Sequence, residues 1–311
     1  MKQVCISEFM DADAVAALDG CVRLRYEPAW VDQRAALLGA LAEADALIVR
    51  NRTRVDAELL DAAPALRVVG RLGVGLDNID VGSCEARGIR VIPATGANAR
   101  SVAEYVVTTA LMLMRGAYQS HAAMVAGQWP RARLSDGREA LGKTLGLIGF
   151  GDIGRTTARL ALALGMQVVA HDPALPDDHP AWRDAGVVPM TLDALLASAD
   201  AVSLHVPLVP ATRHLIDAGR MRAMKRGAVL INTARGGIVD ENALAAALHE
   251  GALAGAALDV FEAEPLGGGG VLAHAPNLVL TPHIAGVSLE ANARVSMMIA
   301  QAVKQALGVQ A

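Results

Sequence analysis

The chain has 311 residues, of which 53% are hydrophobic and 3% aromatic, and its formal net charge is −4 at pH 7. This length allows roughly two domains, each with a core of its own. The slightly acidic balance argues against a nucleic-acid partner, which usually requires a basic surface. Three widely spaced cysteines form neither a zinc-site pattern nor a disulfide framework, so we expect a cytoplasmic protein without a metal site.

In the first third of the chain, short apolar runs alternate with helix-like stretches. The runs are "VCIS", "ALIV" ending at Val49, "RVVG" ending at Gly70 and "IRVI" ending at Ile92. The strand-like "VCIS" follows Met1 almost directly, so we expect no signal peptide. Strands that alternate with helices indicate βαβ units and therefore a parallel sheet with helices on both faces.

A long helix is expected next, in "SVAEYVVTTALMLM". Ser101 lies three residues before Glu104, a spacing that predicts a capping box at the start of this helix. Its nearly uncharged part, Tyr105 to Met114, is too short for a membrane span, which needs about 20 residues. We therefore expect no membrane association.

A second series of apolar runs follows: "LGLIG", "QVVAHD", "AVSLHV", "AVLINTA", "GAALDVF" and "NLVLTPH". The two series together predict an α/β protein with two doubly wound parallel sheets. A second long helix is expected at the end of the chain, with Ser288 as its N-terminal cap. The only low-complexity stretch, Gly267 to Gly270, is consistent with a flexible surface turn.

The stretch "LGLIGFGDIGR" places three glycines as G-x-G-x-x-G between an expected strand and an expected helix. Gly149 would allow the tight turn, Gly151 the close approach of a pyrophosphate, and Gly154 the packing of helix on strand. Asp172 ends the next expected strand, 23 residues after Gly149, where it can accept hydrogen bonds from ribose hydroxyls and repel a 2′-phosphate. This context favours NAD binding over an ordinary strand–helix turn.

Three reactive side chains each follow a strand of the second series: Arg235, Glu264 and His283. The carboxyl ends of strands in a doubly wound sheet border the ligand crevice, so the three can converge there. Histidine can exchange a hydroxyl proton during hydride transfer, a carboxylate can orient it, and a guanidinium can bind a substrate carboxylate. From spacing alone, a surface histidine, a surface arginine and a solvated turn remain equally good interpretations.

Over nearly its whole length the chain resembles the D-isomer-specific 2-hydroxyacid dehydrogenases. The matching segments are "VVGRLGVGLDNID", "NARSVAEYVV", "LGLIGFGDIGR", "HVPLVPATRHLI", "INTARGGIVDE", "LDVFEAEP" and "LTPHIAG". The resemblance implies a flavodoxin-like substrate domain at 1–97 plus 286–311 and a Rossmann NAD-binding domain at 98–285. It also implies that His283 is the acid/base, Glu264 its partner and Arg235 the carboxylate-binding residue.

The same resemblance implies a set of cofactor-binding positions. Asp259 matches the position that contacts the nicotinamide carboxamide, and Thr233 and Ala234 line the cofactor beside Arg235. The full expected set is Gly149, Gly151, Asp152, Ile153, Gly154, Asp172, His205, Val206, Pro207, Thr212, Thr233, Ala234, Asp259 and His283. Homodimers packed through the inserted domain are usual in this family, so a homodimer is expected.

Within the family, the chain is most similar to short 3-phosphoglycerate dehydrogenase-like members. This likeness implies that backbone amides of Leu72, Gly73 and Val74 face the substrate carboxylate, and that Asn98 lies on the substrate side. It also implies that Arg50 and Arg71 reach toward a second anionic group. Arg52 and Arg54 continue an alternating basic segment, which fits either a phosphate- or sulfonate-binding site or a solvated loop.

These motifs predict an NAD-dependent oxidoreductase that interconverts a D-type 2-hydroxyacid and its 2-keto acid. A second anionic group at C3, as in 3-phosphoglycerate or sulfolactate, is expected. One alternative is a hydroxypyruvate or glyoxylate reductase. An alternative of another class is an NAD-sensing, corepressor-like binding protein, for which extended tails or an exposed peptide groove would be required.

Overall fold

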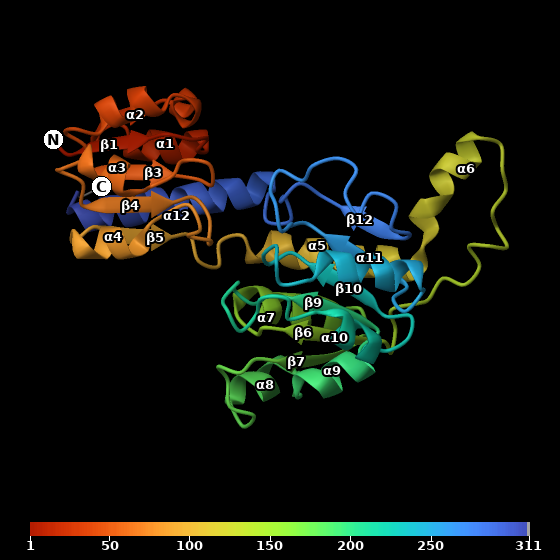
Figure 1. Cartoon of the computed structure of the whole chain (residues 1–311). Coiled ribbons are helices and arrows are strands. Elements are labelled where there is room, and N and C mark those ends of the chain that lie inside the picture. Colours follow the sequence, from red (N-terminus) through yellow and green to blue (C-terminus); the bar gives the residue numbers. More distant parts are fainter. Residues whose placement is uncertain (310–311) are drawn as a thin grey trace. The chain divides into compact units, whose positions relative to one another are not determined.

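The computed structural model describes residues 1–309 and divides the chain into two compact units. Unit 1 comprises Met1–Asn98 together with the C-terminal segment that begins at Val287, and unit 2 comprises Ala99–Gly286. These limits differ by one residue from the expected domain boundaries. Each unit contains one open, entirely parallel sheet, and the two sheets together form the α/β fold that the alternating runs predicted (Figure 1).

The sheet of unit 1 has five strands in the order β2-β1-β3-β4-β5. The strands are β1 (Gln3–Ile6), β2 (Arg23–Tyr26), β3 (Ala46–Val49), β4 (Val68–Arg71) and β5 (Arg90–Pro93). β1 and β3 are buried along their whole length because helices cover both faces of the sheet. This strand order is the flavodoxin-like order that the family resemblance implied.

The helices of unit 1 form two layers. They are α1 (Ala12–Leu18), η1 (Pro28–Asp32), α2 (Arg34–Ala40), α3 (Ala57–Asp61), α4 (Val81–Ala86) and α12 (Leu289–Leu307). α1 and α12 pack on one face of the sheet, and η1 with α2 to α4 pack on the other. Gly70 lets α12 lie close, since a β-carbon there would come within 2.7 Å of Ile299 Cγ2.

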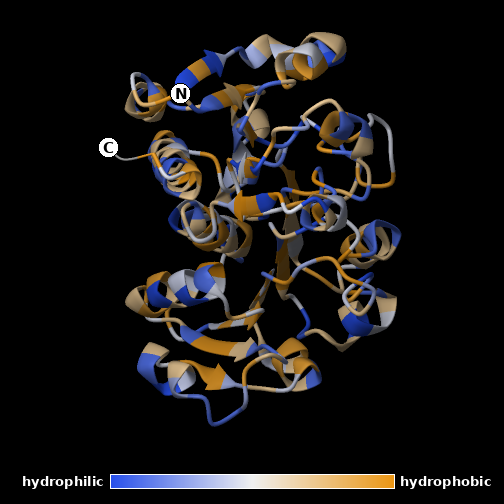
Figure 2. Ribbon diagram, turned by 90° about the vertical axis from the view of Figure 1, so that its left-hand side faces the viewer, coloured by the Kyte–Doolittle hydropathy of each residue, from blue (hydrophilic) through white to orange (hydrophobic). Residues whose placement is uncertain are grey.

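The sheet of unit 2 has seven strands in the order β12-β11-β10-β9-β6-β7-β8. The strands are β6 (Thr144–Ile148), β7 (Gln167–His171), β8 (Val188–Pro189), β9 (Ala201–Leu204), β10 (Val229–Asn232), β11 (Gly255–Leu258) and β12 (Leu278–Leu280). Figure 2 shows that the strands are predominantly hydrophobic, whereas the surrounding helices also carry hydrophilic residues. The order of chain entry reverses between β6 and β9, and in sheets of this kind ligands bind beyond the carboxyl ends of the strands at such a point.

The helices of unit 2 also form two layers. They are α5 (Ala99–Arg115), η2 (Ala117–Ser120), α6 (His121–Val125), α7 (Asp152–Ala163), α8 (Pro180–Ala185), α9 (Leu192–Ser198), α10 (Ala218–Ala223) and α11 (Glu241–His249). α5, α7 and α8 pack on one face of the sheet, and α9 to α11 pack on the other. Gly267 to Gly270 form an exposed turn.

Two local predictions about helix starts had different outcomes. Ser288 is the N-cap of α12, as predicted, and its hydroxyl accepts from Ala291 N at 3.0 Å. The predicted capping box at Ser101 is wrong because α5 begins two residues earlier, at Ala99. Glu104 pairs instead with Arg100, one helical turn before it.

Two features are absent from the described residues. No helix within residues 1–309 combines the length and the apolar character that a membrane span requires. In the same part of the chain, no three histidine, cysteine, aspartate or glutamate side chains lie in an arrangement able to hold a metal ion.

Candidate functional site

The glycine-rich turn joins β6 to α7, where the sequence placed it. Gly149 has a φ of +98°, and a β-carbon there would lie 2.6 Å from the carbonyl oxygen of His205. A β-carbon at Gly154 would lie 2.4 Å from the carbonyl oxygen of Gly149. Both positions therefore require glycine. Gly149 lets the turn lie against the strand end of β9, and Gly154 lets α7 pack closely on the turn after β6, as the motif predicted.

The start of α7 suits an anionic ligand. Gly151 is the N-cap and offers no side-chain acceptor to the free N–H groups of the first turn. A methyl group added at Gly151 would meet no atom within 4 Å, so the space beside the turn is open. The residues present thus fit the pyrophosphate of a dinucleotide, which binds best at such a helix N-terminus.

Asp172 directly follows β7, beside the glycine-rich turn. Its Oδ2 atom accepts from Phe150 N at 2.8 Å, and its Oδ1 atom accepts from Ala174 N at 3.0 Å. These bonds fix the carboxyl group next to the backbone of the turn. A carboxyl group in this place can accept hydrogen bonds from a ribose and would repel a 2′-phosphate.

Other expected cofactor positions lie after β9 and β10. His205 Nε2 and Thr233 Oγ1 are both buried without a hydrogen-bond partner among the described residues. Burial lowers the pKa of His205 to about 4, so this imidazole is neutral at pH 7. By contrast, Thr212 Oγ1 is engaged in its own turn, since it donates to Pro207 O at 2.6 Å. Of the remaining expected positions, Asp152 and Ile153 open α7, Val206 follows β9 and Ala234 follows β10.

His283 and Glu264 are brought together, although the chain between them spans β12. His283 Nδ1 lies 2.8 Å from Glu264 Oε2, and both side chains are partly exposed. Glu264 Oε1 accepts from Phe261 N at 3.0 Å, which fixes the carboxyl group. With its Nδ1 hydrogen held by a carboxylate, an imidazole presents Nε2 for proton exchange.

The turn that carries His283 is held by Asp259, which is 1% exposed. Asp259 Oδ1 accepts from Thr281 Oγ1 at 2.6 Å and from Ile284 N at 2.8 Å, and Oδ2 accepts from Ala285 N at 2.7 Å. These bonds brace the turn in which His283 has a left-handed backbone, with a φ of +57°. The sequence indicates Asp259 only as a cofactor contact, because its anchoring role depends on hydrogen bonds to a turn more than 20 residues away.

Tyr105 of α5 extends this network. Its hydroxyl lies 2.6 Å from Thr281 Oγ1. Because the Thr281 hydroxyl donates its only hydrogen to Asp259, Tyr105 must be the donor in this contact. Burial raises the pKa of Tyr105, and the charge of Asp259 adds to the effect. Neither Tyr105 nor Thr281 was singled out in the sequence, because each reads as an ordinary helix or strand residue.

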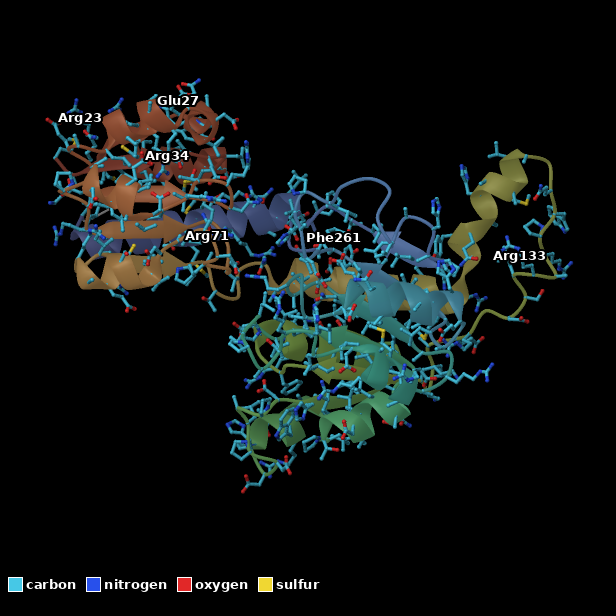
Figure 3. The ribbon with its side chains drawn as sticks, viewed as in Figure 1. Arg23, Glu27, Arg34, Arg71, Arg133 and Phe261 are labelled. Carbon is cyan, nitrogen blue, oxygen red and sulfur yellow. The ribbon has the colours of Figure 1, made fainter. Side chains whose placement is uncertain are left out.

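Arg235 follows β10 on a loop that meets the Glu264 segment. A β-carbon at Gly236 would lie 1.7 Å from the carbonyl oxygen of Phe261, so only glycine fits where the two backbones touch. Asn232 shapes the loop, since its side chain accepts from Ala234 N at 3.0 Å and donates to Arg235 O at 2.9 Å. Phe261, labelled in Figure 3, lies in the turn that follows β11.

The Glu264 segment has a second support. Glu241 Oε1 accepts from Glu262 N at 2.7 Å, and His214 Nε2 lies 3.1 Å from Glu262 Oε1. Burial raises the pKa of Glu241, and the neighbouring charges of Glu262 and Asp240 act in the same direction. These residues were not identified from the sequence, since their pairing depends on loops far apart in the chain.

In unit 1, the loop after β4 is held by hydrogen bonds within the unit. Leu72 N donates to Val49 O at 2.8 Å and Gly73 N donates to Arg71 O at 2.7 Å, so both amides are engaged within the unit. The side chain of Arg71, at the end of β4 (Figure 3), folds back onto this loop, with Nε donating to Gly75 O at 2.9 Å. In this structure the Arg71 side chain satisfies the carbonyl groups of Leu72 and Gly75 in its own loop.

In unit 1, Arg50 is an expected substrate contact whose guanidinium is oriented by neighbouring side chains. Its Nη2 atom donates to Asn292 Oδ1 at 2.9 Å, and its guanidinium lies 5.9 Å from the centre of the Phe9 ring. Burial lowers the pKa of Arg50, an effect that the charge of Glu8 opposes. Asn98 Oδ1 is buried without a hydrogen-bond partner among residues 1–309.

The neighbouring arginines do not extend this site. Arg52 is exposed and pairs with Asp32, while Arg54 is exposed and its carbonyl group accepts from Arg34. Of the two interpretations left open by the sequence, the solvated basic loop describes Arg52 and Arg54 in this structure.

Comparison with known proteins gives matches over the whole chain. Residues 107–285 match the family model described as D-isomer specific 2-hydroxyacid dehydrogenase, NAD binding domain. The chain is 56% identical to (S)-sulfolactate dehydrogenase from Chromohalobacter salexigens, over 100% of both chains. It is 41% identical to hydroxypyruvate reductase from Thermotoga maritima, over 88% of both chains. It is also 41% identical to D-3-phosphoglycerate dehydrogenase from Mycobacterium leprae, over 98% of this chain and 56% of that protein.

The fold has close counterparts among solved structures. The TT0316 protein from Thermus thermophilus superposes with a TM-score of 0.86 and is 36% identical, over 98% of this chain and 97% of that one. This similarity confirms the α/β fold with two parallel sheets that the alternating strands and helices predicted.

Gly236→Ala tests the contact between the Arg235 loop and the Glu264 segment. We expect the added methyl group to force the two backbones apart and to lower the free energy of unfolding by about 3 kcal/mol, as overpacking does. Urea denaturation followed by circular dichroism measures the effect. Gly268→Ala is the matched control, because a β-carbon at Gly268 would meet no atom within 4 Å. Equal stability of the two variants would contradict the contact.

Proposed function

Because this chain belongs to the D-isomer specific 2-hydroxyacid dehydrogenase family, we propose that it interconverts (S)-3-sulfolactate and 3-sulfopyruvate, with NAD as the cofactor. The family, the reaction class and NAD binding were predicted from the sequence motifs, and the matches confirm them. The observation that carries the choice of substrate is the 56% identity to an (S)-sulfolactate dehydrogenase over the full length of both chains.

The (S) descriptor is compatible with a D-specific family. In D-lactate the carboxylate outranks the methyl group at C2, and the centre is labelled (R). In 3-sulfolactate the sulfur atom makes the CH2–sulfonate group outrank the carboxylate, so the same spatial arrangement is labelled (S). An enzyme that removes hydride from the same face of C2 therefore acts on D-lactate-like centres and on (S)-sulfolactate alike.

The proton chemistry is assigned to unit 2. His283 Nε2 takes the C2 hydroxyl proton during oxidation and returns it during reduction, while Glu264 holds the ring through Nδ1. Arg235 binds the substrate carboxylate through two parallel hydrogen bonds, which orients C2. When bound, NAD supplies hydride exchange at C2.

The cofactor positions follow from the glycine-rich turn. The first turn of α7 would hold the pyrophosphate, and Asp172 would accept hydrogen bonds from the adenosine ribose. His205 and Thr233, each with an unpartnered buried polar atom, would complete the lining. The carboxyl group of Asp172 is the reason to favour NAD over NADP.

The sulfonate is assigned to Arg50 of unit 1. A guanidinium has several donors in a rigid plane and matches tetrahedral oxyanions well. Arg50 is already oriented by Asn292, and burial keeps it from being solvated like an ordinary surface arginine. Hydroxypyruvate reduction is the second candidate, since a hydroxypyruvate reductase is 41% identical over 88% of both chains.

A homodimer is proposed through the segment that contains η2, α6 and the following loop. In Figure 1 this segment projects from the rest of unit 2, and Arg133 lies at its far side in Figure 3. It exposes Val125 (76%), Trp129 (75%) and Leu141 (70%). Large apolar side chains on a projecting segment favour burial against a second copy of the chain.

His283→Ala tests the acid/base. We expect kcat to fall by about a hundredfold or more, because general acid/base catalysis contributes that much. The dissociation constant of NADH, measured by fluorescence titration, should stay within about twofold, since the dinucleotide sites named above are untouched. His249→Ala, at the end of α11, is the control. Turnover near the wild-type rate would remove His283 from this role.

Arg50→Ala tests the second anionic group. Initial rates of NADH oxidation are compared for sulfopyruvate, phosphohydroxypyruvate, hydroxypyruvate and glyoxylate. We expect KM for the two acids that carry a second anionic group, sulfopyruvate and phosphohydroxypyruvate, to rise at least about tenfold, the value of a charge-assisted hydrogen bond, and KM for the other two to change little. Arg54→Ala serves as control. Equal losses for all four acids would refute the anion site, and a wild type that prefers hydroxypyruvate would favour the second candidate.

Trp129→Glu tests the dimer. Analytical ultracentrifugation of the wild type should show a dimer, and the buried charge should shift the variant toward the monomer. Val271→Glu places the same charge at another exposed apolar position, 51% exposed, and should leave the dimer intact. A monomeric wild-type protein would contradict the proposal.

A further inference from the structure

A buried glutamate stands directly beside the loop that carries Arg50. Glu8 lies in the turn between β1 and α1 and is only 5% exposed. Its carboxyl group contacts the backbone of the loop formed by residues 50–53, which follows β3. Acidic side chains are rarely buried unless their oxygen atoms are paired.

Both oxygen atoms of Glu8 are satisfied by backbone N–H groups of this loop. Oε1 accepts from Arg50 N at 2.8 Å and from Thr53 N at 2.9 Å. Oε2 accepts from Arg52 N at 3.1 Å and from Asn51 N at 3.3 Å. Four consecutive amides thus converge on one carboxyl group, an arrangement that fixes the backbone of the whole loop.

Further contacts hold the loop from the other side. Asn78 Nδ2 donates to Thr53 O at 2.7 Å and to Arg50 O at 3.3 Å. The hydroxyl groups of Ser7 and Thr53 lie 2.9 Å apart. The carbonyl groups at both ends of the loop are therefore paired as well as its amides.

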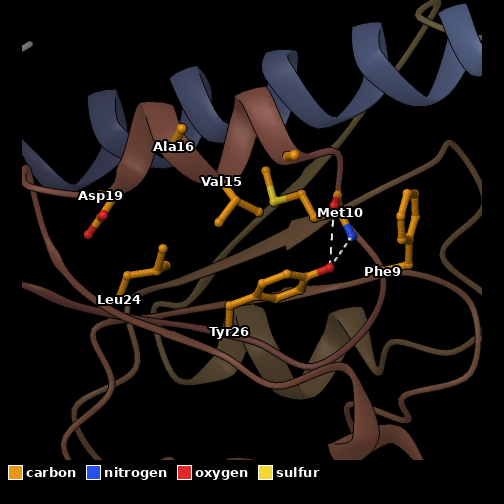
Figure 4. Close-up of a pocket in the computed structure, with 8 residues that line it drawn as sticks. Phe9, Met10, Val15, Ala16, Asp19, Leu24 and Tyr26 are labelled. Carbon is orange, nitrogen blue, oxygen red and sulfur yellow. Dashed lines mark hydrogen bonds between the residues drawn. The ribbon is translucent and has the colours of Figure 1, made fainter.

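The turn that carries Glu8 is itself anchored. Figure 4 shows the Tyr26 hydroxyl between the backbone N and O atoms of Met10, at 3.2 and 3.3 Å. Asp11 N donates to Ser296 Oγ of α12 at 3.1 Å. The turn that carries Glu8 is therefore fixed at two points, by Tyr26 of the neighbouring strand β2 and by Ser296 of α12.

We propose that Glu8 is a positioning residue that fixes the 50–53 loop and thereby aims the Arg50 guanidinium at the second anionic group of the substrate. The inference rests on the proposed role of Arg50. The loop sets where the Arg50 side chain starts, and Asn292 and Phe9 then set where it ends. A guanidinium held in advance loses less conformational entropy on binding an anion than a free surface arginine does.

Glu8→Gln is the sharpest test because it changes the group with almost no change in shape. A glutamine oxygen can replace one carboxylate oxygen, but its NH2 group would face two N–H donors. We expect KM for sulfopyruvate to rise about tenfold while kcat and KM for hydroxypyruvate change less than about threefold. Glu8→Asp, one methylene shorter, keeps the charge and should fall between the wild type and Glu8→Gln.

A double-mutant cycle separates positioning from general damage. In the Arg50→Ala background, Glu8→Gln should cause no further rise in KM for sulfopyruvate, because the guanidinium it positions is gone. Asp32→Asn is the matched control, since it removes the exposed partner of Arg52 beside the same loop without touching the amides of residues 50–53. We expect this control to behave like the wild type.

Hydrogen exchange of the full-length protein gives a readout that is independent of activity. Peptides that cover residues 50–53 should exchange faster in Glu8→Gln than in the wild type, whereas peptides from β6 and β7 should be unchanged. Unchanged exchange at 50–53, or equal KM losses for sulfopyruvate and hydroxypyruvate, would overturn the inference. If the wild type reduces no keto acid with a second anionic group, the proposed substrate is refuted instead, and the exchange data would still decide whether Glu8 holds the loop.

Discussion

The buried carboxyl group of Asp259 fixes the turn from Thr281 to Ala285, and this turn carries His283 of the candidate catalytic pair. Three hydrogen bonds from this turn converge on its two oxygen atoms, and within the turn His283 has a left-handed backbone conformation. In that conformation the imidazole reaches Glu264, which comes from a different strand end. A residue at the end of β11 thus positions a histidine that follows β12, because the two parallel strands finish at the same edge.

Unit 1 uses the same physical device. Glu8, in the turn after β1, accepts hydrogen bonds from four amides of the loop after β3 and so fixes the loop that carries Arg50. In both units a buried carboxylate from one strand end holds the backbone of a neighbouring strand end, and a functional side chain extends from that backbone. Burying a carboxylate lowers the free energy of unfolding unless hydrogen bonds satisfy its oxygen atoms. The fold is therefore stable only while the backbone held by each carboxylate keeps its position.

Glycine plays a complementary role where backbones must touch. At Gly149 and Gly236, a side chain would collide with the carbonyl oxygen of a residue on another loop, at His205 and Phe261. The first contact shapes the dinucleotide turn, and the second brings the Arg235 loop to the Glu264 segment. Both close approaches lie at the carboxyl edge of the unit 2 sheet, which is where the chemistry of an NAD-dependent dehydrogenase is expected.

The sequence by itself determined the alternation of strands and helices, the glycine-rich turn and the residues of the candidate catalytic pair, because each leaves a local pattern of apolar runs or a motif at a strand end. It did not reveal β2 or β8, since β2 alternates basic with apolar residues, β8 has only two residues, and both edge strands are only partly buried. Only the tertiary structure decided that Arg71 folds onto its own loop, that Arg52 pairs with Asp32, and that Asp259, Thr281, Tyr105 and Glu8 act as anchors. Those contacts join residues far apart in the chain, and hydrogen bonds of that kind depend on strand order and loop geometry rather than on local composition.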